Sequence, residues 1–567
     1  MVWLNKRYYS EQGLDILDAS IIADICDQLL RTYGVSSLKG LTDDEADSVK
    51  LGADRYGGSD GTEQGGSGRC GSRGMLNAKG IGPTPLVSKN AAWGYSHGCL
   101  YLYDALKEAI ASEICGAELD NGSIPIIAII DAGFSISESQ ENSPHRCAIY
   151  VRPNFIRASH LERSIFFGTS GYHGSDQAED AKRTRDYNVR LHNGQINGVS
   201  GFSLFSYSHD LASQIASARA HRIWNGRPVT GNLTINAQYF DYGAFRSLPH
   251  WGKADDGHGQ VFGDEGIDIE RSISSLSFFY NKYCSGSFGI EKQKVLFLDT
   301  LNKIDSNFSS CCINAWFGAN STVSDSETNE LRSEIVSFYK SQQRQTYILD
   351  NQPTSDNTDW ISARLNNILI GKNNSDSTCR LSFLISDIEH SRNFYLSSRE
   401  FPTLRCLQWA EPRPDLQYTI ATTKARSAVA SFIRGETAIS EYIRNTISSS
   451  RRVWSYIPSY YIIIGYSYED YFESVFVYSE RGGYDILYRL HTSLSGAALH
   501  RTRIDRHIIY KCAVSNEVAA RITILSKKKL VEYTDTSNFP IIETPRFSFN
   551  SAVRMAEFLG GKAPWKL

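Results

Sequence analysis

A lysine, a glutamate, an asparagine and an aspartate give this 567-residue chain the side chains that phosphate chemistry requires. They are Lys79, Glu108, Asn232 and Asp241. A lysine binds phosphate when a carboxylate holds it in place, and Asn and Asp supply the oxygen ligands that Mg²⁺ prefers. We therefore predict a Lys79–Glu108 charge pair and a metal site at Asn232 and Asp241. Both pairs would serve a nucleotide triphosphate.

A glycine-dense stretch over 55–74 directly precedes the short apolar segment that carries the lysine. Glycine lets backbone N–H groups approach phosphates closely, so we predict a phosphate-binding loop at Gly65, Gly66, Gly68 and Arg69. A Gly/Ser-rich linker has a similar composition and is the alternative interpretation.

The elements that must position these residues follow from apolar periodicity. We expect helices over 14–50, 101–115, 208–224 and 268–283, and strands over 124–130 and 147–152. Residues 160–200 are polar and rich in Gly, Asp and Arg, so we expect a loop or insertion there. Asp264 and Glu265 are expected to be surface charges.

After about residue 400 the chain becomes rich in aromatic and β-branched residues, which predicts a mixed or β-rich C-terminal domain. The expected domains are a helical extension (1–50), an N-lobe (51–125), a C-lobe (126–345) and a substrate- or partner-binding domain (346–567).

Composition excludes several classes of protein. Lys plus Arg is 59 and Asp plus Glu is 62, so the net charge of −3 gives no general attraction to nucleic acid. The apolar runs 124–130 and 460–464 are too short to span a membrane, and the N-terminal residues show no apolar signal segment. Eleven scattered cysteines without metal-ligand spacing predict reduced thiols in the cytoplasm and no zinc site.

Six segments resemble motifs of the selenoprotein O family, kinase-like proteins that transfer AMP to proteins with ATP bound in a flipped orientation. The segments are GSGRC (66–70), AKGIGPTP (78–85), KEAIASE (107–113), YVRPNFIRAS (150–159), GNLTINAQYFDYGAFRS (231–247) and DDGHGQVFG (255–263). They keep the family's order over roughly two-fifths of the chain. The resemblance implies an α+β, two-lobed protein-kinase-like fold that uses ATP and Mg²⁺.

The resemblance also assigns roles to arginines. Arg157 matches the second arginine of a pair that contacts phosphate in the flipped nucleotide, while Tyr150 stands where the family has the first. Arg152 lies two residues further on, and side chains two apart in a strand share a face. Arg152 is therefore a candidate replacement for the missing arginine.

Gly231 is the most informative departure, because the family has a general-base aspartate directly before the metal-binding Asn. A hydroxyl acceptor gains from a base, whereas a carboxylate is already ionised at pH 7. The loss of the base therefore fits adenylation of a carboxylate, such as a peptide C-terminus. The chain also resembles siderophore-microcin maturation proteins, which use ATP and Mg²⁺ to join a siderophore to the C-terminal serine of a peptide and act with an acyltransferase-like partner.

Less specific interpretations accompany each candidate. Lys79 and Glu108 could be solvated surface residues, and Asp241 and Asn232 could be turn or cap residues. Arg152 and Arg157 could form structural salt bridges. Two other functions are also open: a hydroxyl-directed protein AMPylator or kinase, and a non-catalytic nucleotide-binding pseudokinase scaffold.

Overall fold

The structure is a computed structural model of the whole chain. It describes residues 1–16, 18–34, 49–58, 63–137, 144–167, 174–196, 201–255, 261–284, 286–317, 325–348, 361–362, 364–365, 380–381, 383–385, 401–452, 461–468, 472–479, 484–490, 499–504, 519–526, 529–532 and 540–542. The described residues form a mixture of helices and mostly antiparallel sheets, which is the α+β class expected from the sequence.

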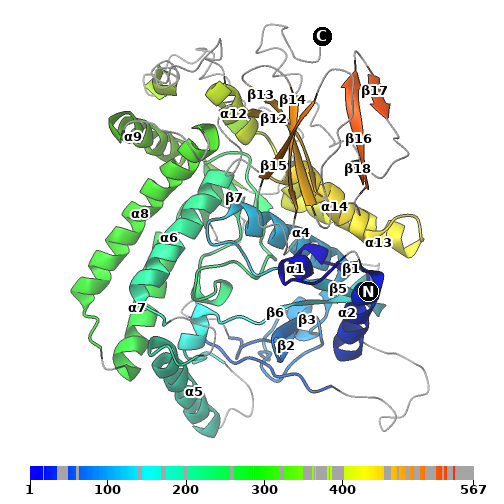
Figure 1. The fold of residues 1–567 in the computed structure, drawn as a ribbon. Coiled ribbons are helices and arrows are strands. Elements are labelled where there is room, and N and C mark those ends of the chain that lie inside the picture. Colours follow the sequence, from blue (N-terminus) through cyan, green and yellow to red (C-terminus); the bar gives the residue numbers. More distant parts are fainter. Residues whose placement is uncertain are drawn as a thin grey trace.

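A six-stranded antiparallel sheet carries the lysine (Figure 1). Its strand order is β1-β5-β6-β3-β2, and β4 also pairs with β6. The bounds are β1 (Trp3–Leu4), β2 (Cys70–Arg73), β3 (Leu76–Lys79), β4 (Leu100–Tyr101), β5 (Ala128–Ile136) and β6 (His145–Pro153). In the register of β3 and β6, Lys79 lies opposite Tyr150 and Asn77 opposite Arg152.

This sheet changes two expected boundaries. The boundary placed between residues 125 and 126 falls inside one structural unit, because β5 and β6 extend the sheet that contains β3. The N-terminal residues are also more than a helical extension, since β1 pairs with β5. Beside β1 lie two helices, α1 (Lys6–Glu11) and α2 (Ala19–Tyr33), and α2 begins where the Asp18 side chain accepts a hydrogen bond from the Ser20 N–H.

Helix α4 (Leu102–Glu118) is the central helix of the molecule and lies just after the short helix α3 (Trp93–Ser96). It contacts β6 on one side and two later helices, α13 (Tyr418–Ile433) and α14 (Ile439–Ser450), on the other. Buried apolar residues occur on most faces of the helix, among them Ala105, Leu106, Ile110 and Ala111. A helix that is apolar on most of its faces is expected to be buried in this way.

A group of helices forms the other half of the core, with α5 to α9 at the left of Figure 1 and α12 near its top. Its members are α5 (Gly174–His192), α6 (Leu204–His221), α7 (Gly266–Tyr283), α8 (Ile290–Phe317), α9 (Asp325–Gln342) and α12 (Phe401–Trp409). Helices α6 and α8 pack together extensively, and α8 also contacts α7, α9 and α12. The helices expected at 208–224 and 268–283 are thus confirmed within a few residues.

The loop expected over 160–200 is wrong, because α5 occupies most of the described part of that range. The buried face of α5 is mainly polar: Asp180, Thr184 and Asn188 are at most 1% exposed. Asp180 accepts a hydrogen bond from the Ser164 N–H, and the Asn188 amide donates to the Leu161 carbonyl. Hydrophobic periodicity misses a helix whose buried stripe is satisfied by hydrogen bonds.

Short strands and one larger sheet complete the fold. The short strands are β7 (Ile223–Trp224), β8 (Arg246–Ser247), β9 (Lys253–Asp255), β10 (Val261–Phe262) and β11 (Thr346–Ile348). The later strands are β12 (Tyr461–Tyr468), β13 (Phe472–Ser479), β14 (Tyr484–Leu490), β15 (Leu499–Ile504), β16 (Ala519–Ser526), β17 (Lys529–Glu532) and β18 (Pro540–Ile542). The mixed or β-rich character was expected after about residue 400. Residues 401–450 are helical in the structure, and the described strands begin only at Tyr461.

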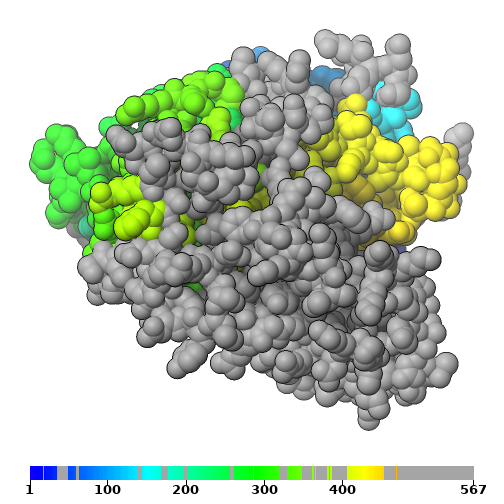
Figure 2. Space-filling view, turned by 90° about the horizontal axis from the view of Figure 1, so that it is seen from above, coloured from blue at the N-terminus to red at the C-terminus, as the bar shows by residue number. Residues whose placement is uncertain are grey.

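The boundary expected at residue 346 also needs correction, because β11 pairs with β9 and helix α12 packs on α8. Residues 401–450 therefore belong with the helical core. In Figure 2 the helices α13 and α14 (yellow) form the surface at the right, and the α8 and α9 region (green) forms the surface at the left. Among the described helices, none combines the length and the apolar character needed to cross a membrane.

Candidate active site

Lys79 and Glu108 form a buried ion pair. The Lys79 Nζ lies 2.8 Å from Glu108 Oε1 and 3.0 Å from Oε2, and both side chains are 3% exposed. Strand β3 ends at Lys79 and continues into Gly80, where φ is +96° and a Cβ would lie 2.5 Å from the Ala148 carbonyl oxygen. Only glycine fits this conformation and this close approach to β6. The predicted pair is therefore present, with Glu108 supplied by α4.

Asp241 joins this pair from a distant part of the chain. Its Oδ1 lies 3.1 Å from Lys79 Nζ, while its side chain keeps 40% of its surface exposed. A small hairpin delivers it, closed by an antiparallel bridge between Leu233 and Tyr239. The Asn225 amide also donates to the Asp241 carbonyl at 2.7 Å. The backbone is thus held while the carboxylate faces the open side of the cluster.

Four cationic side chains surround the Asp241 carboxylate. Burial alone opposes its ionisation, but Lys79, Arg69, Arg152 and Arg157 together hold the pKa of Asp241 well below its usual value. Burial likewise opposes the charge on Lys79, yet the nearby Asp241 and Glu108 carboxylates raise the pKa of its ammonium group. Four cations around two carboxylates leave an excess of two positive charges, which suits an anionic ligand.

Arg152 is 1% exposed and is already engaged by the protein. Its guanidinium donates to Asn77 Oδ1 at 3.0 Å, to the Phe240 carbonyl at 2.5 Å and to the Tyr150 hydroxyl at 3.2 Å. The bond to Tyr150 agrees with the prediction that positions 150 and 152 share a strand face. In this conformation Arg152 acts on the site as a positioning residue, with its hydrogen bonds directed to the protein.

Tyr150 connects that arginine to the ion pair, which the sequence did not reveal. Its hydroxyl accepts from Arg152 and donates to Glu108 Oε2 at 2.8 Å. Glu108 therefore receives hydrogen bonds from both Lys79 and Tyr150. The only hint in the sequence was that Tyr150 stands where the selenoprotein O family has an arginine. A chain of polar contacts now runs from Arg152 to Asp241.

Arg157 lies beside the predicted metal ligands. Its Nη1 donates to the Gly231 carbonyl at 3.0 Å, and its guanidinium lies 4.1 Å from the centroid of the Tyr56 ring. Asn232 ends a 3₁₀ turn (Thr230–Asn232), and its amide Nδ2 is 3.5 Å from the Arg227 carbonyl. Asn232 and Asp241 thus stand at the two ends of the hairpin closed by Leu233 and Tyr239.

The glycine segment packs against the same sheet. Gly66 has φ of +150°, and a Cβ there would lie 2.2 Å from the Asp54 carbonyl oxygen. The Thr84 N–H donates to the Gly68 carbonyl at 2.9 Å. Arg69 follows, with its guanidinium 3.4 Å from the Cys99 carbonyl and 4.9 Å from the Tyr95 ring centroid. Residues 59–62 of the glycine-dense stretch and 256–260 of the last motif lie outside the described residues.

The donor set suits Mg²⁺ better than a metal held by the protein alone. No group of three or more His, Cys, Asp or Glu side chains with metal-binding arrangement occurs in the part of the chain that the structure describes. Mg²⁺ usually takes one or two protein oxygens and completes its shell with water and phosphate oxygens. Asn232 and the ionised Asp241 would supply those two oxygens.

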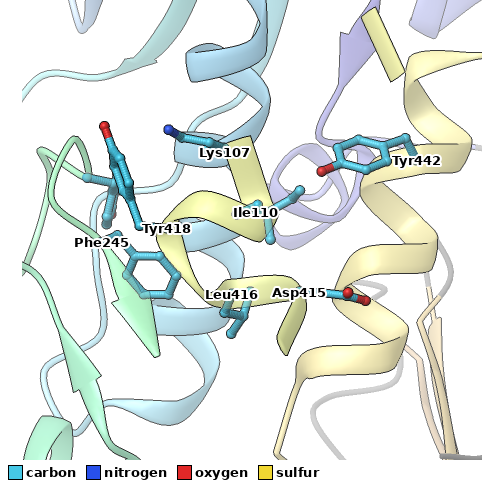
Figure 3. A pocket seen from close by; sticks show the side chains of 9 residues that line it. Lys107, Ile110, Phe245, Asp415, Leu416, Tyr418 and Tyr442 are labelled. Carbon is cyan, nitrogen blue, oxygen red and sulfur yellow. The ribbon is translucent and has the colours of Figure 1, made fainter. Parts of the chain in front are cut away.

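The pocket drawn in Figure 3 lies between α4 and the α13 region, and neither Glu108 nor Asp241 lines it. It is lined by Lys107, Ile110 and Tyr242 together with Asp415 and Tyr418 from the α13 region. Its volume of about 20 Å³ is close to the space of one water molecule. The candidate active site is therefore defined by its contacts and charges, and this pocket is a small gap between α4 and α13.

Comparison with known proteins finds no family model that matches the chain and no match among curated proteins. The resemblance to the selenoprotein O family therefore rests on the six motifs alone.

Proposed function

We propose that this chain is an Mg-ATP-dependent adenylyl transferase with a kinase-like core of the selenoprotein O type. Its acceptor would be a carboxylate, such as the C-terminus of a peptide in the maturation of a siderophore microcin. The observation that carries the proposal is the contact of Lys79 with both Glu108 and Asp241, which lie 29 and 162 positions away in the chain. Three motifs of the resemblance thereby meet at one point.

Charge supports a triphosphate as the ligand. The cluster holds two more positive than negative side chains, and Arg157 lies 7% exposed beside the Asn232 turn. Lys79 would orient the phosphates, and Asn232 and Asp241 would hold Mg²⁺. A bound Mg²⁺ would neutralise part of the phosphate charge. Positioning and electrostatic stabilisation supply most of the catalysis in such reactions.

Gly231 supports a carboxylate acceptor. A Cβ built at this position would meet no atom within 4 Å, so a clash at Cβ does not explain the glycine. An ionised carboxylate needs no base. Its oxygen forms a bond to the α-phosphorus, the bond from that phosphorus to the bridging oxygen breaks, and pyrophosphate leaves. The product is an acyl-adenylate.

Labelled ATP tests this function. The full chain is incubated with candidate peptides and with ATP labelled at the α- or the γ-phosphate, and each peptide is compared with its C-terminal amide. We expect α-label on the free-acid peptide only, in an adduct that hydroxylamine releases. Equal α-labelling of the amidated peptide would support the hydroxyl-directed AMPylator, and γ-labelling would support a kinase.

The variant Gly231→Asp sharpens the choice of acceptor. Because a Cβ at position 231 would meet no atom within 4 Å, we expect the variant to fold and to gain transfer to peptide hydroxyls by about 10²-fold, the lower end of general-base effects. Transfer to carboxylates should change little. The remaining alternative is a non-catalytic pseudokinase scaffold. It is supported by the burial of Lys79 and Arg152, whose polar groups already contact the protein. A scaffold would transfer no label to any peptide.

A further inference from the structure

A cavity of about 460 Å³ lies between the end of α5, the start of α6 and the end of α7. Helix α5 lies beside α7 at the lower left of Figure 1. The volume is within the range of small-molecule sites. Among the described residues that line it, none belongs to the candidate active site and none carries a formal charge at pH 7. They are Val189, His192, Asn193, Phe202, Ser203, Leu204, Phe205, Tyr280, Tyr283, Cys284 and Phe288.

Aromatic rings form the walls, and hydrogen bonds hold them in place. Phe288 is fixed through its backbone: its carbonyl accepts from the Asn281 amide at 2.9 Å, and its N–H donates to Asn281 Oδ1 at 2.6 Å. The Phe205 ring centroid lies 5.6 Å from that of Phe288, and the Tyr280 centroid lies 4.7 Å from that of His192. These contacts fix Phe288 and Tyr280, whereas Phe205 is 61% exposed.

Two buried polar atoms in these walls have no partner among the described residues: His192 Nε2 and the Tyr283 hydroxyl oxygen. The geometry fixes the tautomer of the histidine. His192 Nδ1 lies 2.8 Å from the Asn188 carbonyl oxygen, which can only accept, so Nδ1 carries the hydrogen. Nε2 is then a lone-pair acceptor. Burial lowers the pKa of His192, which keeps the ring neutral at pH 7.

We propose that this cavity binds a neutral aromatic molecule that bears a hydroxyl group. The ligand hydroxyl would donate to His192 Nε2, the Tyr283 hydroxyl would donate to the ligand oxygen, and the ligand ring would pack against Phe202 and Tyr280. Both buried polar atoms would then be satisfied, as buried polar groups in proteins usually are. The absence of charge from the lining disfavours phosphates and carboxylates. This site is independent of the proposed adenylyl transfer.

Calorimetric titration of the full chain tests the proposal, with 2-naphthol as the probe and 2-methoxynaphthalene as the analogue without a hydroxyl donor. We expect 2-naphthol to bind about tenfold more tightly, since one well-formed hydrogen bond accounts for such a difference. The variant His192→Phe keeps an aromatic ring but removes the acceptor. It should bind the two probes equally.

Two further variants complete the experiment. Tyr283→Phe should weaken 2-naphthol binding several-fold, and His209→Phe, at an exposed histidine of α6 outside the cavity, should leave it unchanged. Equal binding of both probes to the unmodified chain, or binding of neither, overturns the proposal. In the latter case ordered water alone satisfies the two atoms. The comparison of the two probes on the unmodified chain needs no variant, so it tests the proposal even if His192→Phe does not fold.

Discussion

Helix α4 carries three buried glutamates that each meet a cation from a distant segment, namely Glu108, Glu113 and Glu118. The centres at Glu108 and Glu118 differ in how open they are. At Glu118, Arg413 Nη1 lies 2.7 Å from Oε2 and the Arg452 backbone N–H donates to Oε1 at 2.6 Å. The side chains of Glu118 and Arg413 are 0% and 2% exposed. At Glu108 the cluster ends in Asp241, whose side chain is 40% exposed.

The Glu118–Arg413 pair joins two parts of the chain, whereas the cluster around Glu108 can receive a ligand. Both oxygens of Glu118 have partners from the segment that follows α12, so this centre fastens that segment to α4. The Glu108 centre has an excess of cations and one open carboxylate. Buried charge alone is therefore a poor indicator of function, and the combination of exposed ligand oxygen and excess charge is a better one.

The largest effect should follow from Glu118→Gln, which leaves Arg413 buried without its counter-ion. Breaking one partner of a buried pair costs about 3–5 kcal/mol. We expect that loss in urea unfolding, with ATP turnover per folded molecule unchanged. Glu291→Gln, at a side chain that is 87% exposed, is the control and should change stability by less than about 0.5 kcal/mol. A similar small loss for Glu118→Gln would mean that the centre does not fasten the segment.

Lys79→Met should have the next largest effect, and on activity. Removing one preorganised charge that stabilises the reacting group typically lowers kcat by about 10²–10³-fold. Lys79 and Glu108 are each 3% exposed, so the variant also breaks a buried pair and should lose about 3–5 kcal/mol of stability. Turnover is therefore compared per folded molecule. The control is Lys107→Met, whose ammonium group donates to Thr422 outside the cluster. If Lys79→Met and Lys107→Met had comparable ATP turnover, the assignment of activity to the Glu108 centre would be wrong.

The pH dependence of stability should distinguish the centres as well. Burial lowers the pKa of His221, which lies beside Glu118, to about 4, against about 6.5 in the unfolded chain. The unfolded state therefore binds the proton more readily, so this stability is complete above pH 6.5 and is lost as the pH falls toward 4. The full shift corresponds to about 3 kcal/mol.

Urea unfolding at pH 7 and pH 5 measures this loss, and His221→Asn should reduce the difference between the two values. Asp241 does not titrate in this range, because its low pKa keeps it ionised throughout. ATP binding should therefore not weaken from protonation of Asp241 between pH 7 and pH 5. An unchanged pH dependence in His221→Asn would contradict the assignment to this histidine.

Tyr150→Phe should produce the smallest effect. It removes the hydrogen bond to Glu108 and the acceptor for Arg152, each worth about 1 kcal/mol. We expect the KM for ATP to rise by less than about tenfold, with the melting temperature lowered slightly. Steady-state kinetics measure the change. An effect as large as that of Lys79→Met would instead mean that the tyrosine itself contacts the nucleotide.

The contacts of Lys79, Glu108 and Asp241 could be predicted from the sequence because each residue stands in a short motif whose chemistry is local. Their surroundings could not. Tyr150 and Asn225 acquire their roles only when the hairpin of residues 233–239 folds against β6, and no local pattern indicates which side chain will fill that space.

The misplaced elements share one physical cause, which is buried polarity. Helix α5 buries Asp180, Thr184 and Asn188 in place of an apolar stripe. Glu265 was expected on the surface, but it is 7% exposed and lies 2.6 Å from Arg219 Nη2; Asp264, with a side chain that is 57% exposed, lies on the surface as predicted. A polar residue is assigned to the surface by composition alone, and only the tertiary partner shows otherwise.

The most direct test of the central claim is a calorimetric titration of the full chain with ATP, with and without Mg²⁺, for the unmodified protein and for Asp241→Asn. If Lys79, Asn232 and Asp241 converge on a magnesium-bound triphosphate, the unmodified protein will bind ATP much more tightly with Mg²⁺, and the variant will lose that gain. Equal ATP affinity in the presence of a chelator, or an intact Mg²⁺ effect in Asp241→Asn, would contradict it.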